Sequence, residues 1–499
     1  MATPNERLDG AQFASSDGKR SSQQTGKEVF ADAVASVDDG LARRILSVGD
    51  WRKGYLDPVR SVVVAGAGSA KSALTIASDG LDSMHRHLTF VREGGEITLE
   101  SALEVQSKTR FNTGEVKGRA GRIRELVIPY RGEELRDDRL RGQLDDWVSA
   151  GVLEHSSANA IQELIKNPDW LDLSDQRFVL LGAASQMGPL GSLLAWGASV
   201  AAVDLPVRGI WDRVVGLARN GSGRLVFPTR AEPGADLETE LDKAGVDLLT
   251  ELPEVSSWMD SLDRPFVLGN YVYADGAKFL RLAGAVDSLI EHSQRKGHLS
   301  ALASLATPTD VFAVPDSLAS EVRARKVGSP LSKALKFTSA GKLYQPNYGE
   351  TIQGEDGSWG ISDCLVPIQG PNYALSKSLQ RWRAIVASDE EMVVSANVAP
   401  ATRTTSVTKN RMLAAAYSQA HRFDIEIFEP ETSSVLMAAL LAHDLRSADS
   451  TTRPGAPLDH PFEIFVDKAV HGGIWRCAYE PRSVLPIALL RGMLSRQSR

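Results

Sequence analysis

The stretch RFVLLGAASQMGPLGSLLAWGASVAAVD, residues 177–204, decides the fold. It places an apolar run, Arg177–Leu181, before a glycine-containing turn, and a second apolar run, 198–203, after a helical stretch, 187–196. Continuous apolar runs are typical of strands that are buried on both faces, as in a parallel sheet. The apolar length would also suit a membrane span, but Gly and Pro interrupt it repeatedly. We therefore predict a strand–turn–helix–strand unit.

Similar units follow along the chain. Strands are predicted at 224–227, 265–268, 300–305 and 392–398, and helices at 237–243, 254–261, 276–294 and 373–387. Alternating strands and helices indicate an α/β fold in which a doubly wound parallel sheet carries helices on both faces.

The chain divides into four predicted regions. Residues 1–28 are polar and predicted to be a disordered tail, and residues 29–170 an N-terminal α/β subdomain with a strand at 61–65. Residues 171–430 form the main domain, with an insertion at 311–371 that is expected to act as a lid: a short helix at 316–326 and then a Gly- and Pro-rich region of loops. Residues 431–499 form a C-terminal extension.

Composition narrows the class of protein. The chain has 499 residues, a net charge of −7 and two cysteines, Cys364 and Cys477. The acidic balance argues against nucleic-acid binding, and two cysteines cannot build a disulfide framework or a structural zinc site. We expect no metal, a small-molecule substrate, a cytoplasmic location, and neither a nucleic acid nor a membrane as partner; self-association stays open.

The turn after the first strand is suited to a nucleotide. Gly182 permits a tight turn and a close approach of backbone to a pyrophosphate, and the segment Ser185-Gln186-Met187-Gly188 leads into the helix N-terminus. Asp204 ends the second strand, where a carboxylate accepts hydrogen bonds from ribose hydroxyls and repels a 2′-phosphate, which favours NAD over NADP. A methyltransferase that uses S-adenosylmethionine has a similar pattern, and so does a nucleotide-free turn.

A catalytic pair is predicted on a later helix. Tyr373 and Lys377 form the chain's one Tyr-x-x-x-Lys, and their spacing puts both side chains on one helix face. The lysine charge can lower the pKa of the phenol toward the working range. A strand then ends at Val398-Ala399-Pro400, and Thr404 follows.

In these motifs the sequence resembles the short-chain dehydrogenase/reductase superfamily. The match covers the outer glycines of the turn, the acid after the second strand, the Tyr-x-x-x-Lys helix and the Val-x-Pro turn with its threonine. The sequence departs from the family at Leu181, Gln186 and Ala401, and the family's Asn-Asn-Ala-Gly is reduced to one asparagine, Asn270. The chain between Gly182 and Tyr373 is also longer than in the family.

The resemblance implies an NAD-dependent oxidoreductase that acts on a carbonyl/alcohol pair. Tyr373 would be the general acid/base, and Lys377 would also hold the nicotinamide ribose. Thr307 would orient the substrate oxygen, with Thr309 as second choice and Ser362 as a rival. The implied cofactor contacts are Gly182, Ser185, Gln186, Met187, Gly188, Asp204, Asn270, Lys377, Pro400 and Thr404. Two alternatives stay open: a non-catalytic NAD-binding regulator or scaffold, and the methyltransferase.

Overall fold

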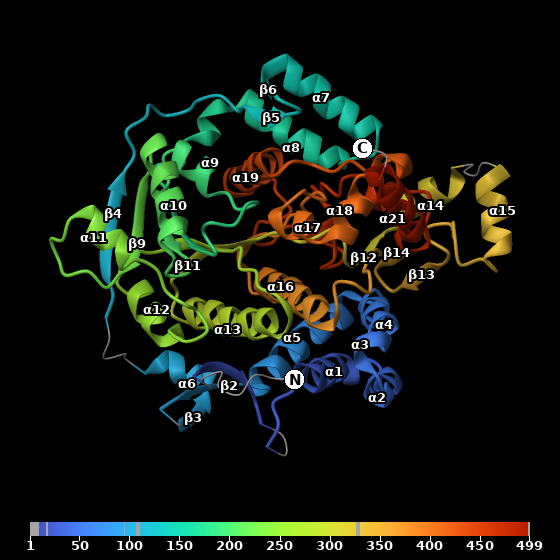
Figure 1. Ribbon diagram of the computed structural model, residues 1–499, viewed down its shortest axis with the longest axis horizontal. Helices are drawn as coiled ribbons and strands as arrows, with labels where there is room; N and C mark the ends of the chain where they lie inside the picture. Colours follow the sequence, from blue (N-terminus) through green and yellow to red (C-terminus); the bar gives the residue numbers. More distant parts are fainter. Residues whose placement is uncertain (1–8, 16–17, 94, 106–109, 326–329, 498–499) are drawn as a thin grey trace.

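A seven-stranded, mostly parallel sheet organises the protein (Figure 1). The computed structural model describes residues 9–15, 18–93, 95–105, 110–325 and 330–497. The strand order is β15-β11-β10-β7-β8-β9-β4, and neighbours run parallel except for β4, which is antiparallel to β9. The strands are β4 (Asn112–Lys117), β7 (Arg177–Leu181), β8 (Ser199–Val203), β9 (Arg224–Thr229), β10 (Phe266–Asn270), β11 (Leu299–Ser304) and β15 (Val393–Ser395). The chain is therefore mixed α/β, as predicted.

Helices cover both faces of this sheet. In β7, Val179 and Leu181 belong to one core cluster, while Phe178 and Leu180 belong to another, because successive side chains point to opposite faces. The first cluster is completed by α12 (Leu252–Met259), α13 (Gly276–Arg295) and α16 (Pro371–Asp389). The second is completed by α9 (Leu190–Ala195), α10 (Arg208–Asn220) and α19 (Pro430–Arg446).

The N-terminal region is more helical than predicted. Residues 61–65 lie in helix α4 (Leu56–Gly66), not in a strand, because Val59 and Val62 are buried at helical spacing. The predicted tail is also wrong in part: β1 (Gly10–Phe13) and the start of α1 (Ser22–Ala35) fall before residue 28. Residues 1–8 and 16–17 lie outside the described residues. The other elements here are α2 (Asp39–Ser47), α3 (Trp51–Gly54), α5 (Ala70–Arg86), β2 (Leu88–Arg92), β3 (Gly95–Thr98) and α6 (Leu99–Glu104).

The described strands of residues 29–170 are divided among three sheets, and β2 and β3 pair with β1 in one of them. Strand β4 lies in this range and pairs with β9 at the edge of the main sheet. Helix α5 packs against α16, the predicted catalytic helix, and α8 packs against α19. The elements after β4 are β5 (Ile128–Tyr130), β6 (Glu133–Leu135), α7 (Asp137–Ser149), α8 (His155–Lys166) and the short η1 (Pro168–Leu171). The N-terminal region is thus a layer on the main domain.

The insertion contains the predicted short helix, but the region after it is folded, whereas the sequence predicted loops there. A small antiparallel sheet has the order β12-β14-β13, and two helices accompany it. Its elements are β12 (Val311–Pro315), α14 (Asp316–Ala324), α15 (Pro330–Thr338), β13 (Thr351–Gly354) and β14 (Gly357–Asp363). Trp359 and Ile361 of β14 are buried, so the glycine-rich segment packs as a layer.

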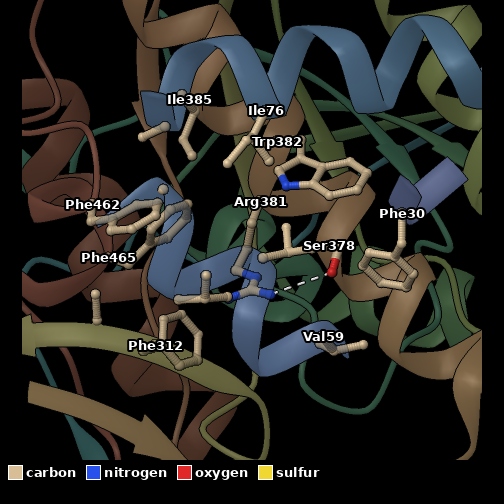
Figure 2. Close-up of a pocket in the computed structure, with 15 residues that line it drawn as sticks. Phe30, Val59, Ile76, Phe312, Ser378, Arg381, Trp382, Ile385, Phe462 and Phe465 are labelled. Atoms are coloured by element: carbon tan, nitrogen blue, oxygen red, sulfur yellow. Dashed lines mark hydrogen bonds between the residues drawn. The ribbon is translucent and has the colours of Figure 1, made fainter. Parts of the chain in front are cut away.

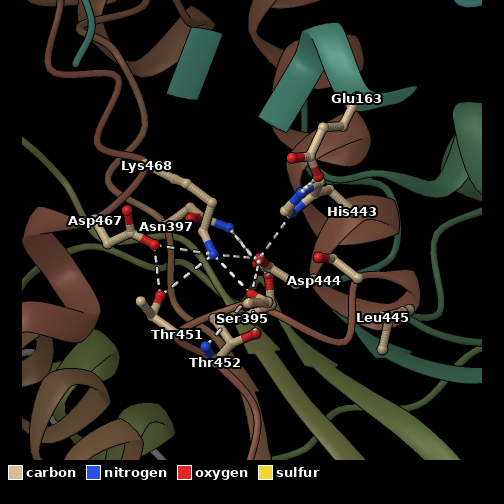
Figure 3. A network of polar contacts seen from close by, with 12 residues as sticks. Glu163, Ser395, Asn397, His443, Asp444, Leu445, Thr451, Thr452, Asp467 and Lys468 are labelled. Atoms are coloured by element: carbon tan, nitrogen blue, oxygen red, sulfur yellow. Dashed lines mark hydrogen bonds and ion pairs between the residues drawn. The ribbon is translucent and has the colours of Figure 1, made fainter. Parts of the chain in front are cut away.

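A buried polar network holds the C-terminal extension to the sheet (Figure 3). Lys468 Nζ lies 2.8 Å from Asp444 Oδ1, and both side chains are buried. Ser395 and Asn397, beside the end of β15, donate to Asp444 Oδ2 at 2.7 and 2.8 Å. Burial opposes the charge of Asp444, but Lys468, His443 and Ser395 lower its pKa to about 2. This network fixes the strand end that leads to Pro400.

Several shorter elements complete the description. They are α11 (Leu237–Asp242), α17 (Thr405–Lys409), α18 (Arg411–Tyr417), η2 (Ala420–Phe423), α20 (Glu463–Val466), η3 (Ile474–Arg476) and α21 (Pro481–Gln497). Among the described helices, none combines the length and the apolar character needed to cross a bilayer.

Candidate functional site

The predicted site residues follow the carboxyl ends of parallel strands. Gly182 follows β7, Asp204 follows β8, Asn270 ends β10 and Thr307 follows β11. A bridge between Ala306 and Val398 extends the pairing of β11 with β15 toward Pro400. Because parallel strands end at one edge of the sheet, these positions meet where open α/β sheets bind ligands.

The glycine turn is formed as the sequence predicted. Gly182 has a φ of +74°, and a Cβ there would lie 2.8 Å from the carbonyl oxygen of Tyr271, so glycine is required. The N–H groups of Gly182 and Ala183 donate to Val203 O, at 2.9 and 3.2 Å. Within the turn, Ser185 N donates to Gly182 O and Gly188 N donates to Ser185 O, both at 3.0 Å.

The Asp204 carboxylate contacts the turn itself, which sequence reasoning did not foresee. Its oxygens accept from the N–H groups of Ala184 and Leu205, each at 2.8 Å. Burial raises the pKa of Asp204 above its ordinary value, and these two hydrogen bonds oppose the shift. A ribose at this point would therefore share the carboxylate with the turn.

The glycine turn contacts the start of helix α17, next to Thr404. Gln186 Oε1 accepts from the N–H of Thr405 at 2.8 Å. Thr404 is the N-cap residue of α17, and its hydroxyl lies 2.9 Å from that of Ser406. Gln186 stands where the family has a glycine, and its side chain thus joins two parts of the site that lie 219 residues apart.

Tyr373 lies in a cluster of hydroxyl and amide groups. Its phenol interacts with the side chains of Thr307, Gln369 and Thr309. Thr307 Oγ1 is 3.0 Å from Thr309 Oγ1, and Gln369 Nε2 donates to Thr309 Oγ1 at 3.0 Å. Burial raises the pKa of Tyr373 to about 12, and nearby Asp310 also raises it. The expected lowering of this pKa by Lys377 is therefore wrong for the chain as it stands.

Lys377 lies one turn further along α16 and is half-buried. Its Nζ donates to Gln380 Oε1 at 2.8 Å and lies 6.0 Å from the centre of the Phe279 ring. Burial lowers the pKa of Lys377 to about 8; Arg381 lowers it further, while Asp310 raises it. Lys377, Thr307, Asp310 and Arg381 line one cavity. That cavity adjoins the predicted catalytic groups.

Arg381 lines both this cavity and a second, more apolar cavity, which Figure 2 shows. Its guanidinium lies 3.3 Å from Asp310 Oδ2 and 4.9 Å from the centre of the Phe312 ring, and it donates to Val311 O. Aromatic side chains dominate the apolar cavity: Phe30, Phe312, Trp382, Phe462 and Phe465. Sequence reasoning missed Arg381, although its spacing of four from Lys377 placed it on the same helix face.

Other predicted groups lie elsewhere. Ser362, the rival to Thr307, is buried in β14, with its hydroxyl 3.4 Å from Cys364 Sγ. Of the insertion, Gln369 reaches the Tyr373 phenol, so part of the predicted lid does contact the site. Gln369 and Asp310 were not predicted, because their approach depends on how the insertion folds.

Comparison of the chain with protein-family models finds no match, and comparison with curated protein sequences finds none either.

Proposed function

We propose that the chain binds NAD through a doubly wound, Rossmann-like domain and acts as an oxidoreductase of the short-chain dehydrogenase/reductase type. Strand order supports the fold. Numbered along the chain, the parallel strands β7, β8, β9, β10, β11 and β15 lie in the order 3-2-1-4-5-6, which is that of dinucleotide-binding domains.

One observation carries the catalytic part of the proposal. The Tyr373 phenol meets the Thr307 hydroxyl at the carboxyl edge of the sheet, on the helix that also carries Lys377. A phenol with a pKa of about 12 is protonated at neutral pH, which suits a proton donor to a carbonyl oxygen. Thr307 would orient that oxygen by a hydrogen bond, and Tyr373 would give it the phenolic proton.

The residues present fit a dinucleotide. The Gly182 turn gives the close backbone approach that a pyrophosphate needs, and in the described chain the N–H groups of Gln186 and Met187 are left after the turn's own hydrogen bonds. Asp204 would hold ribose hydroxyls and disfavour NADP. Lys377 would hold the nicotinamide ribose. The bound NAD would supply or accept the hydride.

A matched pair of variants tests the mechanism. Tyr373→Phe keeps the ring and removes the proton, so reduction of carbonyl compounds, followed by the absorbance of NADH, should fall by about 10²–10⁴. Tyr344→Phe is the control, because its ring packs 5.1 Å from that of Tyr479, where the insertion meets the C-terminal segment. Cofactor affinity should change little in either variant. Undiminished turnover in Tyr373→Phe would remove the catalytic role.

A second candidate function is a non-catalytic NAD-binding regulator or scaffold. Two observations favour it: Asp204 already bonds the turn, and burial raises the pKa of Tyr373 while it lowers that of Lys377. Binding of NAD without turnover on any carbonyl substrate would select this alternative. A parallel titration with S-adenosylmethionine distinguishes these two NAD-binding functions from the methyltransferase alternative, which requires that S-adenosylmethionine binds.

A further inference from the structure

Helix α21 is apolar on the side that faces away from the protein. Its inner side is formed by buried Val484, Ala488 and Gly492. On the outer side, Leu490, Met493 and Leu494 are exposed by 53%, 52% and 57%. Exposed apolar side chains that lie together on one side of a helix mark a candidate contact surface. We therefore expect a binding partner to cover the outer side of α21.

Helix α18 extends this apolar side. A Cβ on Gly492 would lie 2.2 Å from Ala415 O, so α21 and α18 are in close contact (Figure 1). Met412 of α18 is 52% exposed. Exposed cations accompany these side chains. We define the α18–α21 face by its apolar residues Met412, Leu490, Met493 and Leu494 and its cations Lys409, Arg411 and Arg491.

The sequence around this face is strongly basic in an acidic protein. Residues 322–349 hold six Lys or Arg, residues 392–423 hold four and residues 481–499 hold four, with no Asp or Glu in any of the three segments. The whole chain has a net charge of −7. The segments meet in space: Gln345 N donates to Ser483 Oγ at 3.0 Å, and α18 packs on α21. Among the described residues, Arg323, Arg403 and Arg482 of these segments pair with acidic side chains, whereas no ion pair involves Lys409, Arg411 or Arg491 there.

We propose that the α18–α21 face docks on the surface of an anionic lipid bilayer. Apolar side chains flanked by Lys and Arg on an exposed helix are the pattern of interfacial membrane binding. Four exposed apolar side chains do not suit a nucleic acid. A symmetric contact with a second copy would bring the same cations against one another, which is unfavourable. This proposal revises the expectation that no membrane takes part: the membrane is bound at its surface.

The face lies over the candidate site. Helix α18 ends at Tyr417, whose pKa is raised by burial and by its nearness to Tyr373. Helix α17, just before it, contacts the glycine turn through Thr405 and Gln186. Docking would therefore place the bilayer beside helices α17 and α18, which contact the candidate site. Vesicle binding itself does not depend on the proposed NAD chemistry, so either proposal can fail alone.

Sedimentation with vesicles tests the proposal on the full chain. We expect the chain to sediment with vesicles of equal parts phosphatidylcholine and phosphatidylserine, more strongly than with phosphatidylcholine alone, and to be released by added NaCl. Leu490→Asp/Leu494→Asp should weaken binding by at least about tenfold, because it puts charge into the apolar contact. Arg411→Gln/Arg491→Gln should weaken binding to the vesicles that contain phosphatidylserine and leave binding to pure phosphatidylcholine vesicles unchanged.

The control is Leu217→Asp, at a position on α10 that is 39% exposed and away from the α18–α21 face, and it should bind like the unmodified chain. Circular dichroism of each variant checks that it is folded. Absence of binding by the unmodified chain, or equal binding by the Leu490→Asp/Leu494→Asp variant, would overturn the proposal. A stable dimer in light scattering that this variant disperses, without vesicle binding, would overturn it too and assign the face to a second copy.

Discussion

A half-buried histidine should make the stability of this protein depend on pH. His85 of α5 places Nε2 2.8 Å from Asp287 Oδ2 and Nδ1 3.1 Å from Glu291 Oε2, both on α13. Arg383 of α16 binds both oxygens of Asp287, each at 2.8 Å. The cluster joins the N-terminal layer to the two helices that cover the sheet. Burial opposes the charge of His85, but the two carboxylates raise its pKa to about 9.

The magnitude follows from that pKa. An ordinary histidine has a pKa of 6.5, and each pKa unit corresponds to about 1.4 kcal/mol, so protonated His85 stabilises the fold by about 3 kcal/mol. The folded pKa is the higher one. The stabilisation is therefore fully present below pH 6.5 and is lost as the pH rises through about 9.

Urea unfolding at a series of pH values measures this effect. The His85→Gln variant keeps a side-chain hydrogen-bond donor but cannot carry the charge. The difference in unfolding free energy between the two proteins should shrink by about 3 kcal/mol between pH 6.5 and pH 9. Other titrating groups cancel in that difference. A difference that stays constant across this range would refute the reasoning.

Three further variants address the turn and the buried network. Asp204→Ala should erase the preference for NAD over NADP in calorimetric titrations, because it removes the carboxylate that repels a 2′-phosphate. Gly182→Ala should cost about 1–3 kcal/mol in urea unfolding, because alanine strains a φ of +74° and its Cβ crowds Tyr271 O. Lys468→Met should cost about 3–5 kcal/mol, because it leaves the buried Asp444 carboxylate without its counter-charge, and adding Asp444→Asn should recover part of the loss.

The main sheet could be predicted because its strands are buried on both faces. The run Arg177–Leu181 coincides with β7, and the predicted strand at 300–305 is shifted by one residue from β11. The strand predicted at residues 61–65 is a helix for a local reason. Three consecutive valines favour a strand, but packing of the helix against its neighbours outweighs that preference. The sheet of the insertion was not predicted, because glycines suggest loops. Gly360 instead makes room for Ala319 and Tyr348 inside a packed layer.

The site residues also divide into those that the sequence could predict and those that it could not. Thr307 and Gly182 could be located because each directly follows a recognisable strand. Three residues could not be assigned to the site from the sequence: Asp310, Gln369 and Arg381. Their contacts depend on how the insertion folds back toward the main domain. The raised pKa of Tyr373 could not be predicted, because helical spacing does not report the burial that raises it.

Calorimetric titration of the full chain with NAD tests the central proposal most directly. The proposal predicts saturable binding at one site per chain, tighter than for NADP under the same conditions, and weakened in a Lys377→Ala variant whose urea unfolding shows that it is folded. Heat of binding from neither NAD nor NADP, with a fully folded chain, would contradict the proposed cofactor and the oxidoreductase function together.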